Sequence, residues 1–217
     1  MEDSEFKIIK RFGPSVLKVK IPEKIIKTLN DHFDKVIIDK NESKRLNHGE
    51  DLVGDVTQEL KLEKEIMEKS GWVKFLGTNI DKWMKEEIGK GITKFVMLNS
   101  WIVRQYKNEY NPTHWHNGHI SGAGYLKVPK TLGKHYQDKQ NRDYRGGNLQ
   151  LIHGSKMFLS HSTLNIIPEV GDFYFFPNYM MHTVYPFAGS DEERRSISFN
   201  ASIDQNIYDV YSGSNES

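Results

Sequence analysis

Two histidines, His114 and His116, lie two residues apart in the segment PTHWHNGH at 112–119. Successive side chains of a strand point to opposite faces, so these two rings would share one face and could bind one metal ion. A third histidine, His182, and an arginine pair, Arg194 and Arg195, follow in that order. A single histidine is more often a surface or core residue than a ligand. The ordered combination, however, indicates a metal site.

The composition limits what such a site can contain. Cysteine is absent from the sequence, which excludes disulfides, zinc ribbons, iron–sulfur clusters and thiol nucleophiles. Any transition-metal ligands must therefore be imidazole or carboxylate groups. The sequence also has no Gly-x-Ser-x-Gly elbow, which argues against a general hydrolase.

Charge and hydropathy bear on partners and location. The formal net charge of +1 provides no electrostatic reason to expect nucleic acid or an anionic membrane as a partner. No apolar run approaches the roughly 18 residues of a membrane span, and the first residues do not resemble a signal peptide. We therefore expect a soluble, cytoplasmic protein.

Residues 1–92 predict a helical segment that braces a sheet. Apolar residues recur at helical spacing after Pro22, in EKIIKTLNDHFDKVI. A second helix is predicted over residues 57–69, and a third, FLGTNIDKWMKEEIG, ends near Gly89. Residues 40–56 are polar and predict a loop.

Residues 93–205 predict a β core, and residues 206–217 a flexible tail. Many short strands without intervening helices favour an all-β sandwich or barrel. The basic segment 130–146 predicts a loop, which is either a solvated connection or a lid over the substrate. The predicted strands are 94–106, 119–128, 148–153, 163–167, 172–176, 181–185 and 196–203.

Three segments resemble the Fe(II)/2-oxoglutarate-dependent oxygenases, in particular a group found in bacteria and their phages. They are NPTHWHNGHISGAGYLKVP at 111–129, GGNLQL at 146–151 and EVGDFYFFPNYMMHTVYPFAGSDEERRSISFN at 169–200. The resemblance implies a double-stranded β-helix, the jelly roll of cupin-like proteins. It also implies a dioxygenase, usually a hydroxylase, that uses Fe(II), O2 and 2-oxoglutarate as cosubstrate.

The resemblance further implies which residues bind the metal. His114 and His182 match the first and distal ligands of the family's facial triad, whose middle ligand is normally a carboxylate. This chain has His116 at the middle position. Three neutral imidazoles would leave the site doubly positive, and they suit zinc, nickel and copper as well as iron. His119 is an alternative partner for His116, but the spacing favours His114.

In the family, an arginine on the last core strand, with Ser or Thr two residues later, binds the far carboxylate of 2-oxoglutarate. The planar guanidinium suits this role because it meets a carboxylate bidentately. Strand alternation favours Arg194 with Ser196 over Arg195. The polar face would also carry Ser198 and Asn200, and the apolar face Ile197, Phe199 and Ala201.

Five other side chains also carry expectations. Tyr106 and Tyr125 either donate hydrogen bonds to 2-oxoglutarate or form ordinary aromatic core. Trp115 is expected to pack on the face opposite the ligand histidines. His153 and His161 are expected at the surface.

Two rival functions remain open. A cupin-type dioxygenase with three histidine ligands would need no 2-oxoglutarate, and a non-catalytic jelly roll would serve only as a binding module. The substrate, small-molecule or peptidyl, is not specified by the sequence. The oligomeric state is also open, and the N-terminal helices could form a homodimer contact.

Overall fold

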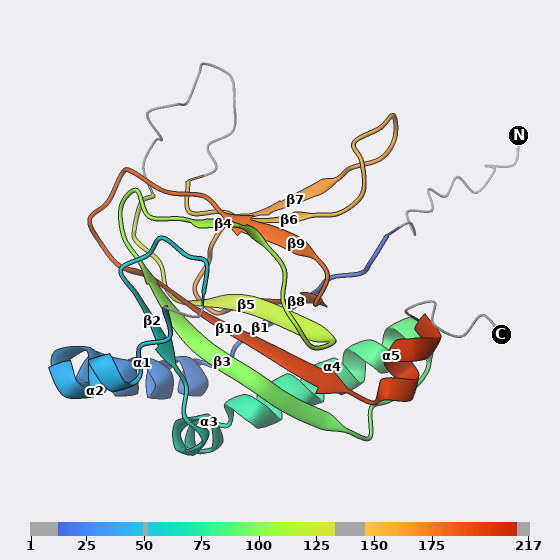
Figure 1. Cartoon of the computed structure of the whole chain (residues 1–217), viewed down its shortest axis with the longest axis horizontal. Helices are drawn as coiled ribbons and strands as arrows, with labels where there is room; N and C mark the ends of the chain where they lie inside the picture. The colour runs from blue at the N-terminus through green and yellow to red at the C-terminus, as the bar shows by residue number, and fades with distance from the viewer. Residues whose placement is uncertain (1–12, 50–51, 133–145, 212–217) are drawn as a thin grey trace, which may run out of the picture.

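The structure is a computed structural model that describes residues 13–49, 52–132 and 146–211. Two antiparallel sheets lie one above the other, and most of the helices are gathered beneath the larger sheet (Figure 1). The larger sheet has the strand order β1-β8-β5-β10-β3-β2, and the smaller sheet the order β4-β9-β6-β7. This architecture confirms the predicted fold class, mainly β with N-terminal helices.

Both sheets combine strands from distant parts of the chain. The larger sheet consists of β1 (Leu17–Lys20), β8 (Asp172–Pro177), β5 (Ile120–Lys127), β10 (Arg194–Ile203), β3 (Phe95–Gln105) and β2 (Gln58–Lys61). The smaller sheet consists of β4 (Asn111–His114), β9 (Met181–Val184), β6 (Leu149–Ile152) and β7 (Thr163–Ile166). Two strands of the larger sheet, β1 and β2, therefore come from the part of the chain before residue 92.

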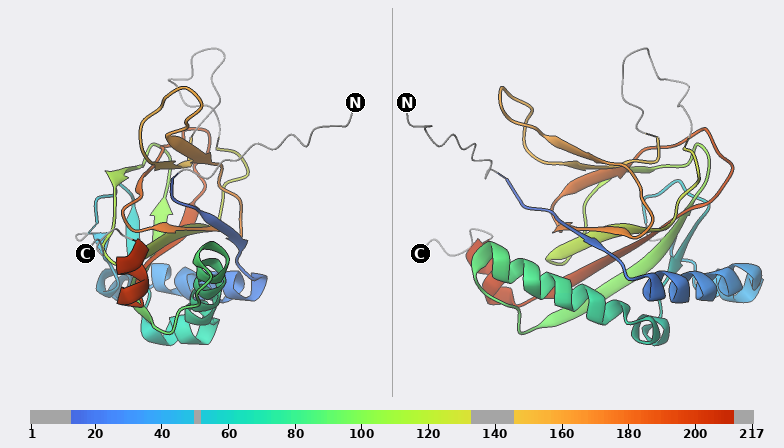
Figure 2. Two further views of the ribbon diagram at one scale, coloured as in Figure 1. Left: turned by 90° about the vertical axis from the view of Figure 1, so that its right-hand side faces the viewer. Right: turned by 180° about the vertical axis from the view of Figure 1, so that it is seen from behind.

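Most of the helices, α1, α3 and α4 among them, cover the outer face of the larger sheet (Figure 2). The apolar stripe of α1 is buried there, because residues at helical spacing share one face. Helix α4 is bounded at both ends by glycines, Gly71 and Gly89, in the left-handed conformation. The helices are α1 (Glu23–Ile38), α2 (Lys40–Arg45), α3 (Lys64–Ser70), α4 (Trp72–Ile88) and α5 (Gln205–Tyr211).

The predicted helix over 57–69 is wrong in its first half. Residues 58–61 form strand β2, which pairs with β3 along the edge of the larger sheet. Its two central residues, Glu59 and Leu60, are both buried. Four residues are too few for strand alternation to be recognised, and the apolar residues that follow continue at a helix-compatible spacing.

Other segments also differ from expectation. The predicted loop 40–56 contains the short helix α2, and helix α5 occupies the first part of the predicted tail. Most of the predicted basic loop, residues 133–145, lies outside the described residues. None of the helices in the described parts of the chain is long and apolar enough to cross a membrane.

The side chains of strand β10 point alternately to two different surroundings. Ile197, Phe199 and Ala201 belong to the core on the helix side of the sheet, which also contains buried residues of α1 and α4. Ser196 and Ser198 face a cavity between the two sheets. The polar and apolar faces of this strand are therefore as the alternation predicts.

Gly124 of β5 allows β5 and β8 to approach each other closely. A Cβ at this position would lie 2.6 Å from the backbone oxygen of Asp172. We expect Gly124→Ala to lower the free energy of unfolding by about 1–3 kcal/mol, measured by urea denaturation, because the backbone of β8 must move.

Gly77 of α4 is a matched control for this prediction. The nearest side-chain atom to a Cβ there, on Phe95, is at 3.7 Å, an ordinary contact. Gly77→Ala should stabilise the protein by about 0.5–1 kcal/mol, because alanine favours the helix. Equal effects of the two substitutions would contradict the close approach at Gly124.

Candidate active site

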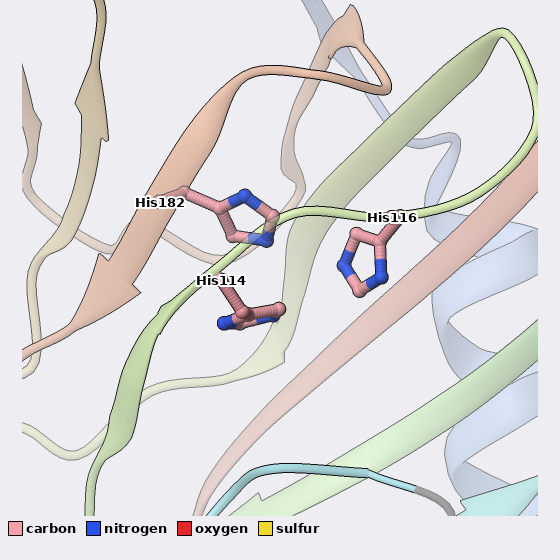
Figure 3. A group of neighbouring side chains, drawn as sticks. All are labelled: His114, His116 and His182. Atoms are coloured by element: carbon pink, nitrogen blue, oxygen red, sulfur yellow. The ribbon is translucent and has the colours of Figure 1, made fainter.

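Three histidines converge between the sheets, and we refer to His114, His116 and His182 as the histidine cluster (Figure 3). One ligand nitrogen from each ring lies within 4.8 Å of the others. The ring centroids of His114 and His182 are 4.2 Å apart, and His116 lies 4.9 and 5.0 Å from these two rings. The structure therefore brings together the three residues singled out from the sequence.

Strand pairing explains this convergence. His114 at the end of β4 lies directly opposite His182 on β9, next to a register shift in that pair of strands. The segment after β4 is held to the turn between β8 and β9, because the His116 N–H donates to the Asn178 carbonyl at 3.1 Å. The Asn178 amide donates in return to the His116 carbonyl at 3.2 Å. These bonds position His116 beside the two paired histidines.

Backbone hydrogen bonds determine the tautomers of two rings. His114 Nδ1 lies 2.7 Å from the Pro112 carbonyl, and His182 Nδ1 lies 2.8 Å from the Met180 carbonyl. A carbonyl oxygen only accepts, so each Nδ1 must carry the hydrogen. The Nε2 atom of each ring is therefore unprotonated and available to a metal, in the usual arrangement of ligand histidines.

The cluster is neutral at pH 7. Burial lowers the pKa of His116 to about 3 and that of His182 to about 4, and neighbouring imidazoles contribute to both shifts. Burial also lowers the pKa of His114. Metal binding requires neutral imidazole, so this donor set fits a divalent transition metal without prior loss of protons.

The cluster opens into a cavity of about 140 Å³ between the sheets. Arg194 of β10 lines this cavity and is only 2% exposed. Its Nη1 donates to Gln105 Oε1 at 2.7 Å, whereas its Nε has no hydrogen-bond partner among the described residues. No carboxylate of the described residues forms an ion pair with it. A buried cation without an ionic partner is costly, so this position favours an anionic ligand.

Arg195 points the other way, towards helix α1. Its guanidinium donates to Asn30 at 3.0 Å, to Asp34 at 2.8 Å and to Glu193 at 2.8 Å. These contacts explain its burial without any ligand. The alternation of β10 therefore places Arg194, and not Arg195, at the cavity.

The two predicted tyrosines have different surroundings. Tyr125 is fully buried, pairs with Ser196 across β5 and β10, and lies under the Arg194 guanidinium at 4.9 Å from the ring centre. Its hydroxyl has no hydrogen-bond partner in the described part of the chain. Tyr106 instead accepts a hydrogen bond from Arg104 at 2.7 Å, and neither tyrosine is among the residues that line the cavity. The structure thus brings only Tyr125 to the arginine.

His119 and Trp115 also have defined places. The His119 ring stacks on Tyr208 at 4.0 Å and its Nδ1 accepts from the Ile203 N–H, so it does not join the cluster. Trp115 lines the cavity but is 62% exposed. Its expected packing is wrong, because the segment after β4 leaves the sheet and most of the Trp115 side chain stays exposed. His153 and His161 are exposed, as expected.

Two residues of the site were not predicted from the sequence: Gln105, which contacts Arg194, and Glu59, which lines the cavity. Gln105 lies directly opposite Arg194 on the neighbouring strand, and Glu59 lies opposite Val103. Glu59 lines the cavity at 3% exposure, and burial raises its pKa to about 7. Both assignments depend on strand register, for which the sequence carries no local signal.

Comparison with known proteins agrees with this site. The model of a family described as "Putative 2OG-Fe(II) oxygenase" matches residues 99–200, a range that contains the histidine cluster and Arg194. No curated protein matches the chain.

Several solved structures share the fold. A prolyl-4-hydroxylase from Pseudomonas putida has a TM-score of 0.58 and 13% identity, with 89% of this chain and 92% of that chain covered. A viral collagen prolyl hydroxylase from Paramecium Bursaria Chlorella virus-1, in complex with 2OG, has a TM-score of 0.54 and 14% identity, with 86% and 94% covered. HygX from Streptomyces hygroscopicus, with iron bound, has a TM-score of 0.55 and 8% identity, with 88% and 83% covered. At such identities the likeness concerns the fold alone.

Proposed function

We propose that the histidine cluster binds the catalytic Fe(II). The premise is that this chain is a member of the 2OG-Fe(II) oxygenases, whose family model matches residues 99–200. The observation that carries the proposal is the pairing of two features in one cavity. Three neutral imidazoles converge there, beside a buried guanidinium that has no acidic partner among the described residues. A divalent metal and a dicarboxylic acid satisfy both features together.

Arg194 and Ser196 anchor 2-oxoglutarate in this proposal. Both side chains line the cavity from the same face of β10. Gln105 holds Nη1 of the arginine, while the unpartnered Nε remains free to donate. The nearby Tyr125 hydroxyl, also unpartnered in the described chain, supplies a further donor. These groups fit a carboxylate, because charge-assisted bonds from a planar guanidinium are short and directional.

When bound, iron and 2-oxoglutarate supply the oxidising chemistry, in which O2 and 2-oxoglutarate yield succinate and CO2 and the substrate gains one oxygen atom. The protein positions the reactants and excludes water. The backbone carbonyls of Pro112 and Met180 orient two of the ligand rings. Apolar side chains such as Val103 and Leu149 form much of the cavity wall. The substrate proposed is a small molecule or a peptidyl residue that becomes hydroxylated.

The proposal is tested by the cosubstrate requirement of turnover. Protein stripped of metal with a chelator should release succinate from 2-oxoglutarate only after Fe(II) is restored, and slow release is expected even without the primary substrate. Calorimetry should show that 2-oxoglutarate binds to the Mn(II)-loaded protein and not to the metal-free protein. Absence of metal binding would instead favour a non-catalytic jelly roll.

A second candidate function is favoured by one feature, the lack of a carboxylate in the cluster. A cupin-type dioxygenase uses three histidine ligands and no 2-oxoglutarate. In that case O2 consumption by the Fe(II)-loaded protein would not depend on 2-oxoglutarate, and no succinate would form. The buried Arg194 supports the first candidate, because a cupin has no general need for such an anchor.

A further inference from the structure

One carboxyl group in the cavity has no place in the proposed chemistry. Glu59 of β2 is 3% exposed, and it is the only acidic side chain among the described residues that line the cavity. Its Oε2 is buried without a hydrogen-bond partner in the described chain. A buried carboxyl of this kind is costly unless a ligand or partner completes it.

Two glycines lie next to the carboxyl group of Glu59. A Cβ at Gly54 would lie 3.2 Å from Oε1, and one at Gly49 would lie 3.8 Å from Oε2. Side chains at these positions would therefore crowd the carboxyl group. Burial raises the pKa of Glu59 to about 7, which reflects the missing stabilisation of the charged form.

Neither the metal nor 2-oxoglutarate accounts for this group. The ligand nitrogens of the three histidines lie within 4.8 Å of one another, and Glu59 is not part of this group. 2-Oxoglutarate is itself anionic, so a carboxylate would repel it. The remaining partner for Glu59 in the cavity is the primary substrate.

We propose that Glu59 is a specificity residue that binds a positively charged nitrogen, an ammonium or guanidinium group, at the end of an aliphatic stem of the substrate. This inference rests on the proposed function and adds a substrate class to it. A cation is favoured over a neutral donor because it both bonds to the buried carboxylate and neutralises it.

The mouth of the cavity suits the stem of such a group. Val53 and Trp115 line the cavity and are 55% and 62% exposed. Apolar and aromatic surface at the entrance can contact the methylene groups of a long basic side chain. The indole face of Trp115 also attracts cations that pass over it. The cavity therefore offers an apolar entrance followed by a single buried acid.

Matched probes test this inference by NMR titration of protein loaded with Mn(II) and 2-oxoglutarate. N-acetyl-lysinamide and N-acetyl-argininamide carry the charge, and N-acetyl-norleucinamide has a similar stem without it. Glu59→Gln keeps the shape of the side chain and should weaken binding of the two basic probes by about tenfold. Its affinity for the norleucine probe should not change.

Two further variants sharpen the test. Glu65→Gln changes an exposed glutamate of α3 and should bind all probes like the wild type. Glu59→Asp keeps the charge and should retain part of the preference for the basic probes. Wild-type protein that binds the basic and norleucine probes equally, or a Glu59→Gln variant with unchanged affinities, overturns the inference. Loss of Mn(II) from Glu59→Gln with no change in probe selectivity also overturns it.

The experiments distinguish a failure of the proposed function from a failure of this inference. The same titrations are repeated on metal-free protein, and metal and 2-oxoglutarate binding are measured beforehand. A wild type that binds neither rejects the oxygenase proposal, whereas a Glu59-dependent preference for basic probes still supports the acidic subsite. Equal binding of charged and uncharged probes in both preparations rejects the subsite alone.

Discussion

Replacement of His182 by alanine is expected to reduce iron-dependent succinate release at least about a thousand-fold, equivalent to about 4 kcal/mol of lost transition-state stabilisation. The ring is 5% exposed and its Nδ1 donates to the Met180 carbonyl, so its Nε2 is held towards the other two histidines. Without it, two imidazoles remain, and the metal loses one of its three anchors. Metal content by mass spectrometry and succinate release measure the effect together.

His161→Ala is the matched control for this experiment, because His161 is exposed. It should retain iron and turnover. Circular dichroism of the His182 variant should match the wild type, since the core on the helix side of the larger sheet does not include this residue. Undiminished metal-dependent turnover in the His182 variant would remove this histidine from the site.

Arg194→Lys is expected to raise the KM for 2-oxoglutarate roughly 10- to 100-fold, with a smaller effect on kcat at saturating cosubstrate. Hydrogen bonds to charged groups contribute about 1.5–3 kcal/mol each, and lysine cannot reproduce the bidentate geometry of a guanidinium. The change retains the positive charge, so the loss reports geometry and not charge alone. Initial rates of succinate release over a range of 2-oxoglutarate concentrations measure it.

Arg195→Lys makes the same chemical change one residue further along the strand. Because Arg195 faces Asn30, Asp34 and Glu193 on the helix side, this substitution should lower the free energy of unfolding and leave the KM unchanged. Similar increases in KM for the two variants would show that the direction of the β10 side chains does not decide which arginine binds 2-oxoglutarate.

The sequence by itself determined the features that depend on local backbone geometry. The change from helical spacing to short strands near Gly91 predicted the architecture. The two-residue period of strands predicted which face of β10 carries Arg194. It also predicted that His114 and His116 lie close together, although His116 lies after the end of β4 and is held there by its bonds to Asn178. These rules hold within one strand or helix, since side-chain direction follows from the backbone of that element alone.

Only the tertiary structure decided which residues from distant strands meet. Glu59 reaches the cavity because β2 pairs with β3, and Gln105 meets Arg194 because β3 pairs with β10 in one register. Tyr125 and not Tyr106 lies beside the arginine for the same reason. Register between strands separated by many residues is set by the packing of whole faces, so no short sequence pattern records it.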